Sequence, residues 1–155
     1  MKSLIVIFTM TLFIHGPLSA QDSPDFGDHR SATLTAKAWE ALGAGNAKLA
    51  ITYTEKCISM YRAQAVEMQT GLDGFAPTDP PEAASKYWAL NDVGTCLFIK
   101  GEALMKLGQK EQALAAYKEL VEKLGYAQCW DTKGWFWRPA DAPKQKIVEL
   151  EFDQQ

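Results

Sequence analysis

Side chains that could carry acid–base, nucleophilic or metal chemistry are scarce in this chain of 155 residues. Its two histidines, His15 and His29, both precede residue 31. A histidine-based triad or a metal site with several histidines is therefore excluded. Hydrolysis of a glycosidic bond needs two carboxylates about 5 to 9.5 Å apart, and Asp92, Glu102 and Asp131 are candidates. Nothing in the sequence brings two of them together, so we expect no enzyme, and glycan hydrolysis ranks third among the functions.

The cysteines are the other potentially reactive groups. Cys57, Cys96 and Cys129 make an odd number, which allows at most one internal disulfide. The favoured pair is Cys57 with Cys96, because these residues belong to helices that we expect to pack together. The alternative is that all three thiols are reduced and buried as small apolar groups. The spacing does not match a zinc motif, and we expect neither a metal nor a cofactor.

A third group of candidates is aromatic. Trp130, Trp135 and Trp137 fall within residues 126–139, a segment that breaks helical periodicity. Exposed rings of this kind could bind the faces of sugars. The alternative is that the segment folds back as a loop and buries its indoles against the last helices.

Charge and length limit the partners. The formal net charge is −3 and becomes −4 once Lys2 is removed with the first 20 residues. Lysines alternate with acidic residues instead of forming a basic patch, so nucleic acid is not an expected partner. The remaining residues suffice for one domain with its own core.

The first 20 residues have the pattern of a cleaved secretory signal. Lys2 precedes an apolar run over 4–14, and the small residues Ser19 and Ala20 follow. The run is too short to span a bilayer, which takes about 20 residues. We therefore expect cleavage near Ala20, export to the periplasm or beyond, and no stable membrane insertion afterwards.

Apolar residues that recur every three or four positions predict an all-α fold after a loose segment over 21–30. Ser31 is expected to cap the first helix, and Asp79 the third. The helices after the first are expected at 47–68, 81–107, 111–124 and 141–152.

An internal repeat organises these helices. At an offset of 63, small and apolar residues recur as helix–turn–helix units at 31–61 and 94–124. The paired positions are Leu34 and Leu97, Ala38 and Gly101, Gly45 and Gly108, Ala50 and Ala113, Ile51 and Leu114, and Ile58 and Val121.

The pattern resembles the tetratricopeptide repeat, a unit of 34 residues, so 63 minus 34 leaves a 29-residue insertion between the two units. The chain is also similar to exported bacterial repeat proteins around Trp88–Asp92 and its later tryptophans. The resemblance implies one domain over 31–155, made of antiparallel helix pairs, an aromatic loop and a C-terminal capping helix. Three repeats are the usual minimum, so the array could also complete itself by homodimerising.

In the repeat family the first helices of successive units line a concave groove. Carried over to this chain, the partner-binding residues are Thr35, Trp39, Phe98, Glu102 and Met105. The resemblance therefore implies a non-catalytic scaffold that binds a protein or peptide segment carrying a basic side chain. Two alternatives remain: the insertion and the cap fill this groove, or the module binds cell-wall or extracellular polysaccharide through its tryptophans.

Overall fold

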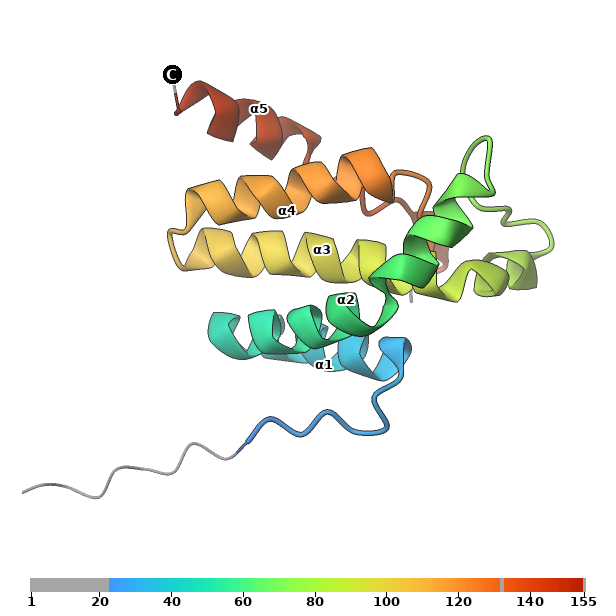
Figure 1. The fold of residues 1–155 in the computed structure, drawn as a ribbon, viewed down its shortest axis with the longest axis horizontal. Coiled ribbons are helices and arrows are strands. Elements are labelled where there is room, and N and C mark those ends of the chain that lie inside the picture. Colours follow the sequence, from blue (N-terminus) through green and yellow to red (C-terminus); the bar gives the residue numbers. More distant parts are fainter. Residues whose placement is uncertain (1–22, 132, 155) are drawn as a thin grey trace, which may run out of the picture.

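The computed structural model describes residues 23–131 and 133–154, and its fold is all-α (Figure 1). Within these ranges there are five α-helices, one 3-10 helix and one two-stranded sheet. In chain order they are α1 (Ser31–Gly43), α2 (Ala47–Thr70), η1 (Pro81–Tyr87), α3 (Trp88–Lys106), α4 (Lys110–Lys123), β1 (Cys129–Asp131), β2 (Trp135–Trp137) and α5 (Lys144–Phe152).

The first four α-helices form two pairs joined by short turns. Gly45 between α1 and α2 has a φ of 78°, and Gly108 between α3 and α4 has a φ of 72°. Glycine adopts this left-handed conformation without the steric cost that a Cβ imposes. Helix α3 packs against α1, α2 and α4, so it is the central helix of the domain (Figure 1).

Several equivalent positions of the internal repeat are buried in both pairs, among them Leu34 with Leu97 and Ala50 with Ala113. Ala38, Ala50 and Ala113 have no exposed surface. A Cβ added at Gly101 would lie 2.1 Å from the ring of Tyr117, so only glycine allows α4 to approach α3 this closely. Small residues at these positions therefore set the distance between the helices, as the repeat pattern predicts.

The predicted third helix, 81–107, is divided in two. Residues Pro81–Tyr87 form the 3-10 helix η1, and the regular helix begins only at Trp88. The side chain of Asn91 donates from Nδ2 to the carbonyl of Ala84, 3.0 Å away, an oxygen that a continuous α-helix would bond to the N–H of Trp88. The predicted cap at Asp79 is also wrong, because Pro80 occupies the cap position and makes no side-chain cap bond.

The region before α1 also differs from the prediction. Arg30, not Ser31, holds the cap position of α1. The segment before it, expected to be loose, packs on the domain: the Phe26 ring meets that of Tyr53 edge-on, with centroids 5.9 Å apart. The Tyr61 hydroxyl donates to the His29 carbonyl at 3.0 Å. An aromatic side chain and a hydroxyl on α2 therefore hold this segment in place.

The aromatic segment, predicted as a loop, forms a hairpin. Strands β1 and β2 are antiparallel, with Trp130 opposite Phe136 and Asp131 opposite Trp135. Gly134, with a φ of 96°, lies in the connecting turn. Alternation along the strands sends neighbouring aromatic rings to different faces, which periodicity of the helical kind does not reveal.

The predicted signal segment, 1–20, lies outside the described residues. Among the helices described, none is long and apolar enough to cross a membrane.

Candidate functional site

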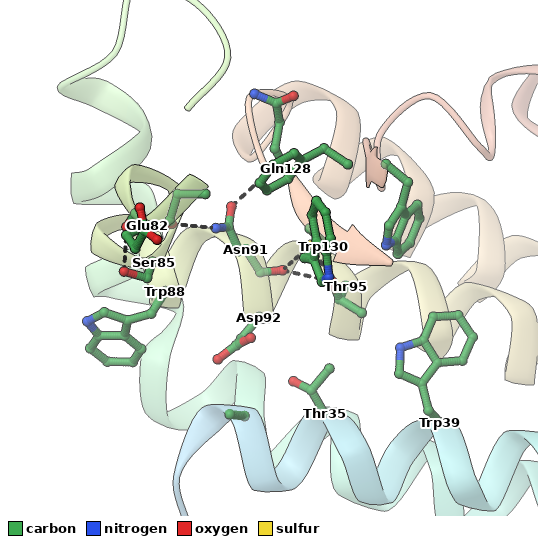
Figure 2. A pocket seen from close by; sticks show the side chains of 15 residues that line it. Thr35, Trp39, Glu82, Ser85, Trp88, Asn91, Asp92, Thr95, Gln128 and Trp130 are labelled. Atoms are coloured by element: carbon green, nitrogen blue, oxygen red, sulfur yellow. Dashed lines mark hydrogen bonds between the residues drawn. The ribbon is translucent and has the colours of Figure 1, made fainter. Parts of the chain in front are cut away.

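A cavity of about 640 Å³ lies between α1, η1, α3 and the hairpin (Figure 2). We call it the aromatic pocket. Five of its lining side chains are aromatic, and most of the others are polar or small. The lining residues are Ala32, Thr35, Trp39, Glu82, Ala84, Ser85, Trp88, Asn91, Asp92, Thr95, Gln128, Cys129, Trp130, Phe136 and Trp137.

The pocket joins the two sites that the sequence suggests separately. Thr35 and Trp39 come from the predicted groove, whereas Trp130 and Trp137 come from the tryptophan-rich segment. Helix α1 and the hairpin meet over α3, so that the Trp39 and Trp137 rings are in contact, with centroids 6.3 Å apart. The α1 part of the predicted groove and part of the aromatic segment are therefore two walls of one cavity.

Phe98 supports this wall from behind. Its half-buried ring lies 6.0 Å from the Trp39 ring and 5.5 Å from the Trp137 ring, measured between centroids. Phe98 is not among the lining residues of the pocket. Its contacts fix the direction of both indoles, so its role here is to position the side chains that a ligand would touch.

Glu102 and Met105, also predicted for the groove, lie elsewhere. Glu102 accepts a hydrogen bond of 2.6 Å from the Tyr117 hydroxyl and pairs with the Lys146 ammonium group on α5. Met105 packs against the second apolar cluster, which includes Leu150. Helix α5 lies in the range where the capping helix was predicted, and it packs against α4 while its Lys146 reaches Glu102 on α3.

Trp135 is the third tryptophan of the predicted aromatic site, and it does not line the pocket. It is 53 % exposed, close to the 59 % of Trp130 on the opposite strand. The hairpin therefore offers two similarly exposed indoles, of which only Trp130 faces the cavity.

Several lining residues were not predicted as site residues. Glu82 and Ser85 come from η1, and Trp88 from the first turn of α3. The run Trp88–Asp92 was the only sequence signal for them. Glu82 and Ser85 could not be predicted, because the Asn91 bond described above positions η1 and leaves no local pattern. Trp88 and Trp39 lie at opposite ends of the cavity, with Asp92 and Thr35 between them (Figure 2).

Most polar groups of the pocket hold its walls together. Asn91 bonds η1 through Ala84 and accepts from the backbone N–H of Gln128 at 3.0 Å. Thr95 donates to the Asn91 carbonyl at 2.8 Å, and its hydroxyl contacts the Cys129 thiol at 3.0 Å. One asparagine thus connects η1, α3 and the entry to the hairpin, and a buried amide with these partners gives the pocket one defined shape.

Asp92 is different, because its carboxylate faces the cavity and is half-buried. The Ser31 hydroxyl donates to its Oδ2 at 2.5 Å. Burial raises the pKa of Asp92 above its usual value, and the Ser31 hydrogen bond opposes this only in part. The side chain of Ser31, expected to cap α1, is instead used to bond this carboxylate across to α3.

All three cysteines are free thiols in the structure, so the predicted Cys57–Cys96 disulfide is not formed in it. Cys57 and Cys96 are both fully buried, and burial, followed by the hydrogen bond and charge of Cys57, raises the pKa of Cys96 well above that of a free thiol. The two side chains are thus neighbours, as the pairing requires. Counting free thiols in the non-reduced protein decides between the two states.

The pocket offers few groups for chemistry. None of the described residues that line it is a histidine, and burial raises the pKa of the Cys129 thiol to about 12. A thiol with that pKa is protonated at neutral pH and is a poor nucleophile. Over the described ranges, no cluster of three or more histidine, cysteine or acidic side chains could hold a metal ion.

In comparisons with known proteins, no family model, no curated protein and no solved structure matches this chain.

Proposed function

We propose that the chain is a non-catalytic binding module of the periplasm or extracellular space, and that it receives a segment of a partner protein in the aromatic pocket. One observation carries this proposal: rings from α1, α3 and the hairpin converge on a cavity of about 640 Å³. That volume lies within the range of about 300 to 1,000 Å³ that is usual for ligand sites. Tryptophan is among the residues most enriched at the hot spots of protein interfaces.

Two features make the pocket suited to binding. The hydrogen bonds of Asn91 to η1 and to Gln128 fix its walls before a ligand arrives, which lowers the entropic cost of association. Trp39 is 39 % exposed, so its indole is packed on one side and open on the other. A ligand could therefore bury the open side without moving the packed one.

The tetratricopeptide resemblance remains part of the proposal. It is supported by the two glycine turns and by the buried small residues at equivalent positions of both helix pairs. The export signal is proposed from sequence alone. On this proposal the module works outside the cytoplasm, where a short helical array presents the aromatic pocket to a partner.

A test is to screen the mature chain against immobilised peptides that tile the exported proteins of its source organism. For the peptides that bind in the screen, Trp130→Ala should lower the affinity by at least about tenfold, because truncating an aromatic anchor typically costs more than 1 kcal/mol. Trp135→Ala is the matched control and should leave them unchanged, because Trp135 is similarly exposed but lies outside the pocket. Circular dichroism confirms that both variants keep their helices. Peptides that bind both variants equally would show that the pocket is not the site.

The second candidate function is binding of polysaccharide. It is favoured by the exposure of Trp130 and Trp135, which are both more than half open to solvent. The register places these two indoles on opposite faces of the hairpin, so a glycan chain that passes around its edge would contact both. Retention on cell-wall glycans that is lost in Trp130→Ala and in Trp135→Ala, without any positive peptide, would support this function against the first.

A further inference from the structure

The charge of the aromatic pocket points to the chemistry of its ligand, and this inference rests on the proposed function. Glu82 and Asp92 are both acidic, and no lysine, arginine or histidine is present among the described lining residues. The ion pairs found in the described part of the chain include neither of these acids. The pocket therefore has an excess of negative charge that a cationic ligand would compensate.

Asp92 is the group on which this argument depends. Among the described residues, its only side-chain hydrogen bond comes from the neutral hydroxyl of Ser31. A half-buried carboxylate without a cation is costly, since burial removes the hydration of its charge. Its Oδ1 atom remains available as an acceptor at the cavity wall. A ligand that brings a cation and hydrogen-bond donors would supply both the missing positive charge and a donor for Oδ1.

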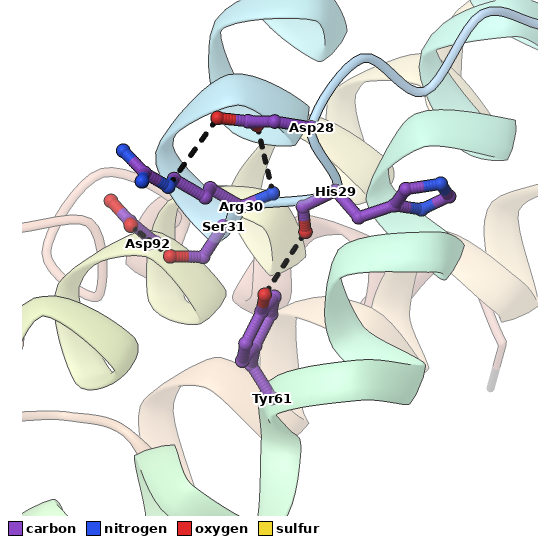
Figure 3. Close-up of polar contacts among 6 residues, drawn as sticks. All are labelled: Asp28, His29, Arg30, Ser31, Tyr61 and Asp92. Carbon is purple, nitrogen blue, oxygen red and sulfur yellow. Dashed lines mark hydrogen bonds and ion pairs between the residues drawn. The ribbon is translucent and has the colours of Figure 1, made fainter.

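The carboxylate is open to the cavity from two directions. A second hollow of about 310 Å³, formed by Arg30, Ser31, Ala32, Tyr61, Trp88 and Asp92, adjoins the aromatic pocket. The two share Ala32, Trp88 and Asp92, so Asp92 lies where they meet. Arg30, which lines this second hollow with Asp92, pairs with Asp28 at 3.4 Å, as Figure 3 shows, and no ion pair joins it to Asp92.

The aromatic rings around Asp92 favour one kind of cation. Asp92 points toward the side of the cavity where Trp88 lies, whereas Trp39 lies at the opposite end (Figure 2). The faces of indole rings attract cations, and the planar guanidinium group stacks on them better than an ammonium group does. The molecule itself contains such a contact, because the Arg138 guanidinium lies 3.5 Å from the centroid of the Phe75 ring.

We propose that the aromatic pocket recognises an arginine side chain of the partner segment, with its guanidinium group against the Trp88 indole and paired with Asp92. Oδ1 can accept one guanidinium N–H, and Oδ2, which already accepts from Ser31, has a second lone pair for another. The rest of the segment would continue over Thr35 and Trp39 toward the hairpin.

The test uses two short peptides, acetyl-Gly-Arg-Gly-amide and the same peptide with citrulline, which has nearly the same shape but no charge. Binding is followed by NMR through the indole N–H signals, assigned with single Trp→Phe variants. The arginine peptide should bind the wild-type chain at least about tenfold more tightly than the citrulline peptide at low salt. Asp92→Asn should remove this preference, whereas Glu82→Gln, at the exposed rim, should largely keep it.

Equal binding of the two peptides would overturn the proposal, and so would a preference that survives Asp92→Asn. A lysine peptide that binds more tightly than the arginine peptide would overturn the choice of guanidinium. The comparison of arginine with citrulline needs no variant, so it stays decisive even if Asp92→Asn does not fold. If screened peptides without arginine still require Trp130, this inference fails while the proposed function stands. If glycans bind and no peptide does, both fail.

Discussion

Asp92 and Glu102 are ten residues apart on α3, yet they meet opposite conditions. Glu102 is bonded by the Tyr117 hydroxyl and paired with Lys146 at the end that α4 and α5 cover. Asp92 has the Ser31 hydroxyl and faces an open cavity at the other end. One acid is neutralised within the fold, and the other is left with a deficit. A side chain whose charge the fold does not compensate is the better candidate for a ligand contact.

The covered end of α3 should lose the most stability on substitution. Gly101→Ala places a methyl group 2.1 Å from the Tyr117 ring, and Tyr117 is fully buried. We expect a loss of about 2 to 3 kcal/mol in the free energy of unfolding, although alanine is the better helix former by about 1 kcal/mol. Urea unfolding measures it.

The matched control is Gly43→Ala at the end of α1, where an added Cβ meets nothing within 4 Å. This variant should be neutral or slightly stabilising. Equal losses at Gly43 and Gly101 would show that the close contact of α3 with α4 does not matter for stability.

The second largest loss of stability is expected when Glu102, the acid at the covered end of α3, is substituted. Glu102→Ala removes the acceptor of the Tyr117 hydroxyl and the partner of Lys146, so we expect a loss of about 1 to 2 kcal/mol. Glu102→Gln should lose less, since its amide oxygen can still accept. The control is Glu122→Ala on the exposed side of α4, with an effect below about 0.5 kcal/mol. If Glu102→Ala left the free energy of unfolding unchanged, the contacts of Glu102 would not stabilise the fold, and the contrast with Asp92 would fail.

The smallest change in stability is expected at Asp92, at the open end of α3, and it is a gain on substitution. The pKa of Asp92 is raised in the folded state, so the folded chain keeps this proton to a higher pH than the unfolded chain does. As pH rises from the ordinary value of 3.8, the unfolded state loses the proton first, and Asp92 then reduces stability until the folded state has also lost it.

Asp92→Asn should therefore be slightly more stable than the wild type near neutral pH, and the difference should shrink as pH falls toward 3.8. Unfolding curves of both proteins over this range measure the difference. Subtraction cancels the contributions of Asp25 and Asp28, whose lowered pKa values have the opposite effect on stability. A variant less stable than the wild type at every pH would mean that the carboxylate is a structural contact.

Periodicity was sufficient to predict most helices, because a buried stripe repeats every three to four residues. The helices predicted over 47–68 and 111–124 correspond to Ala47–Thr70 and Lys110–Lys123. Periodicity failed at η1 and at the cap of α1, where side chains of Asn91 and Ser31 bond distant residues rather than neighbours. Such bonds leave no local pattern.

The candidate site was predicted only in its parts. Trp39 and Trp130 stood out as aromatic residues in two separate segments, but nothing in their spacing showed that the segments share a cavity. Trp88 and Asp92 were recognisable only as part of a short run. The distance between residues 39 and 130 along the chain is closed by packing of α1 and the hairpin on α3.

The amino-acid sequence by itself determined the all-α class and the glycine turns of the helix pairs, because these depend on side-chain periodicity and on the conformational freedom of single residues. The tertiary structure alone decided which acid is neutralised and which faces the pocket. That outcome depends on where α5 and the hairpin pack, and on contacts such as Glu102 with Lys146, whose partners are 44 residues apart.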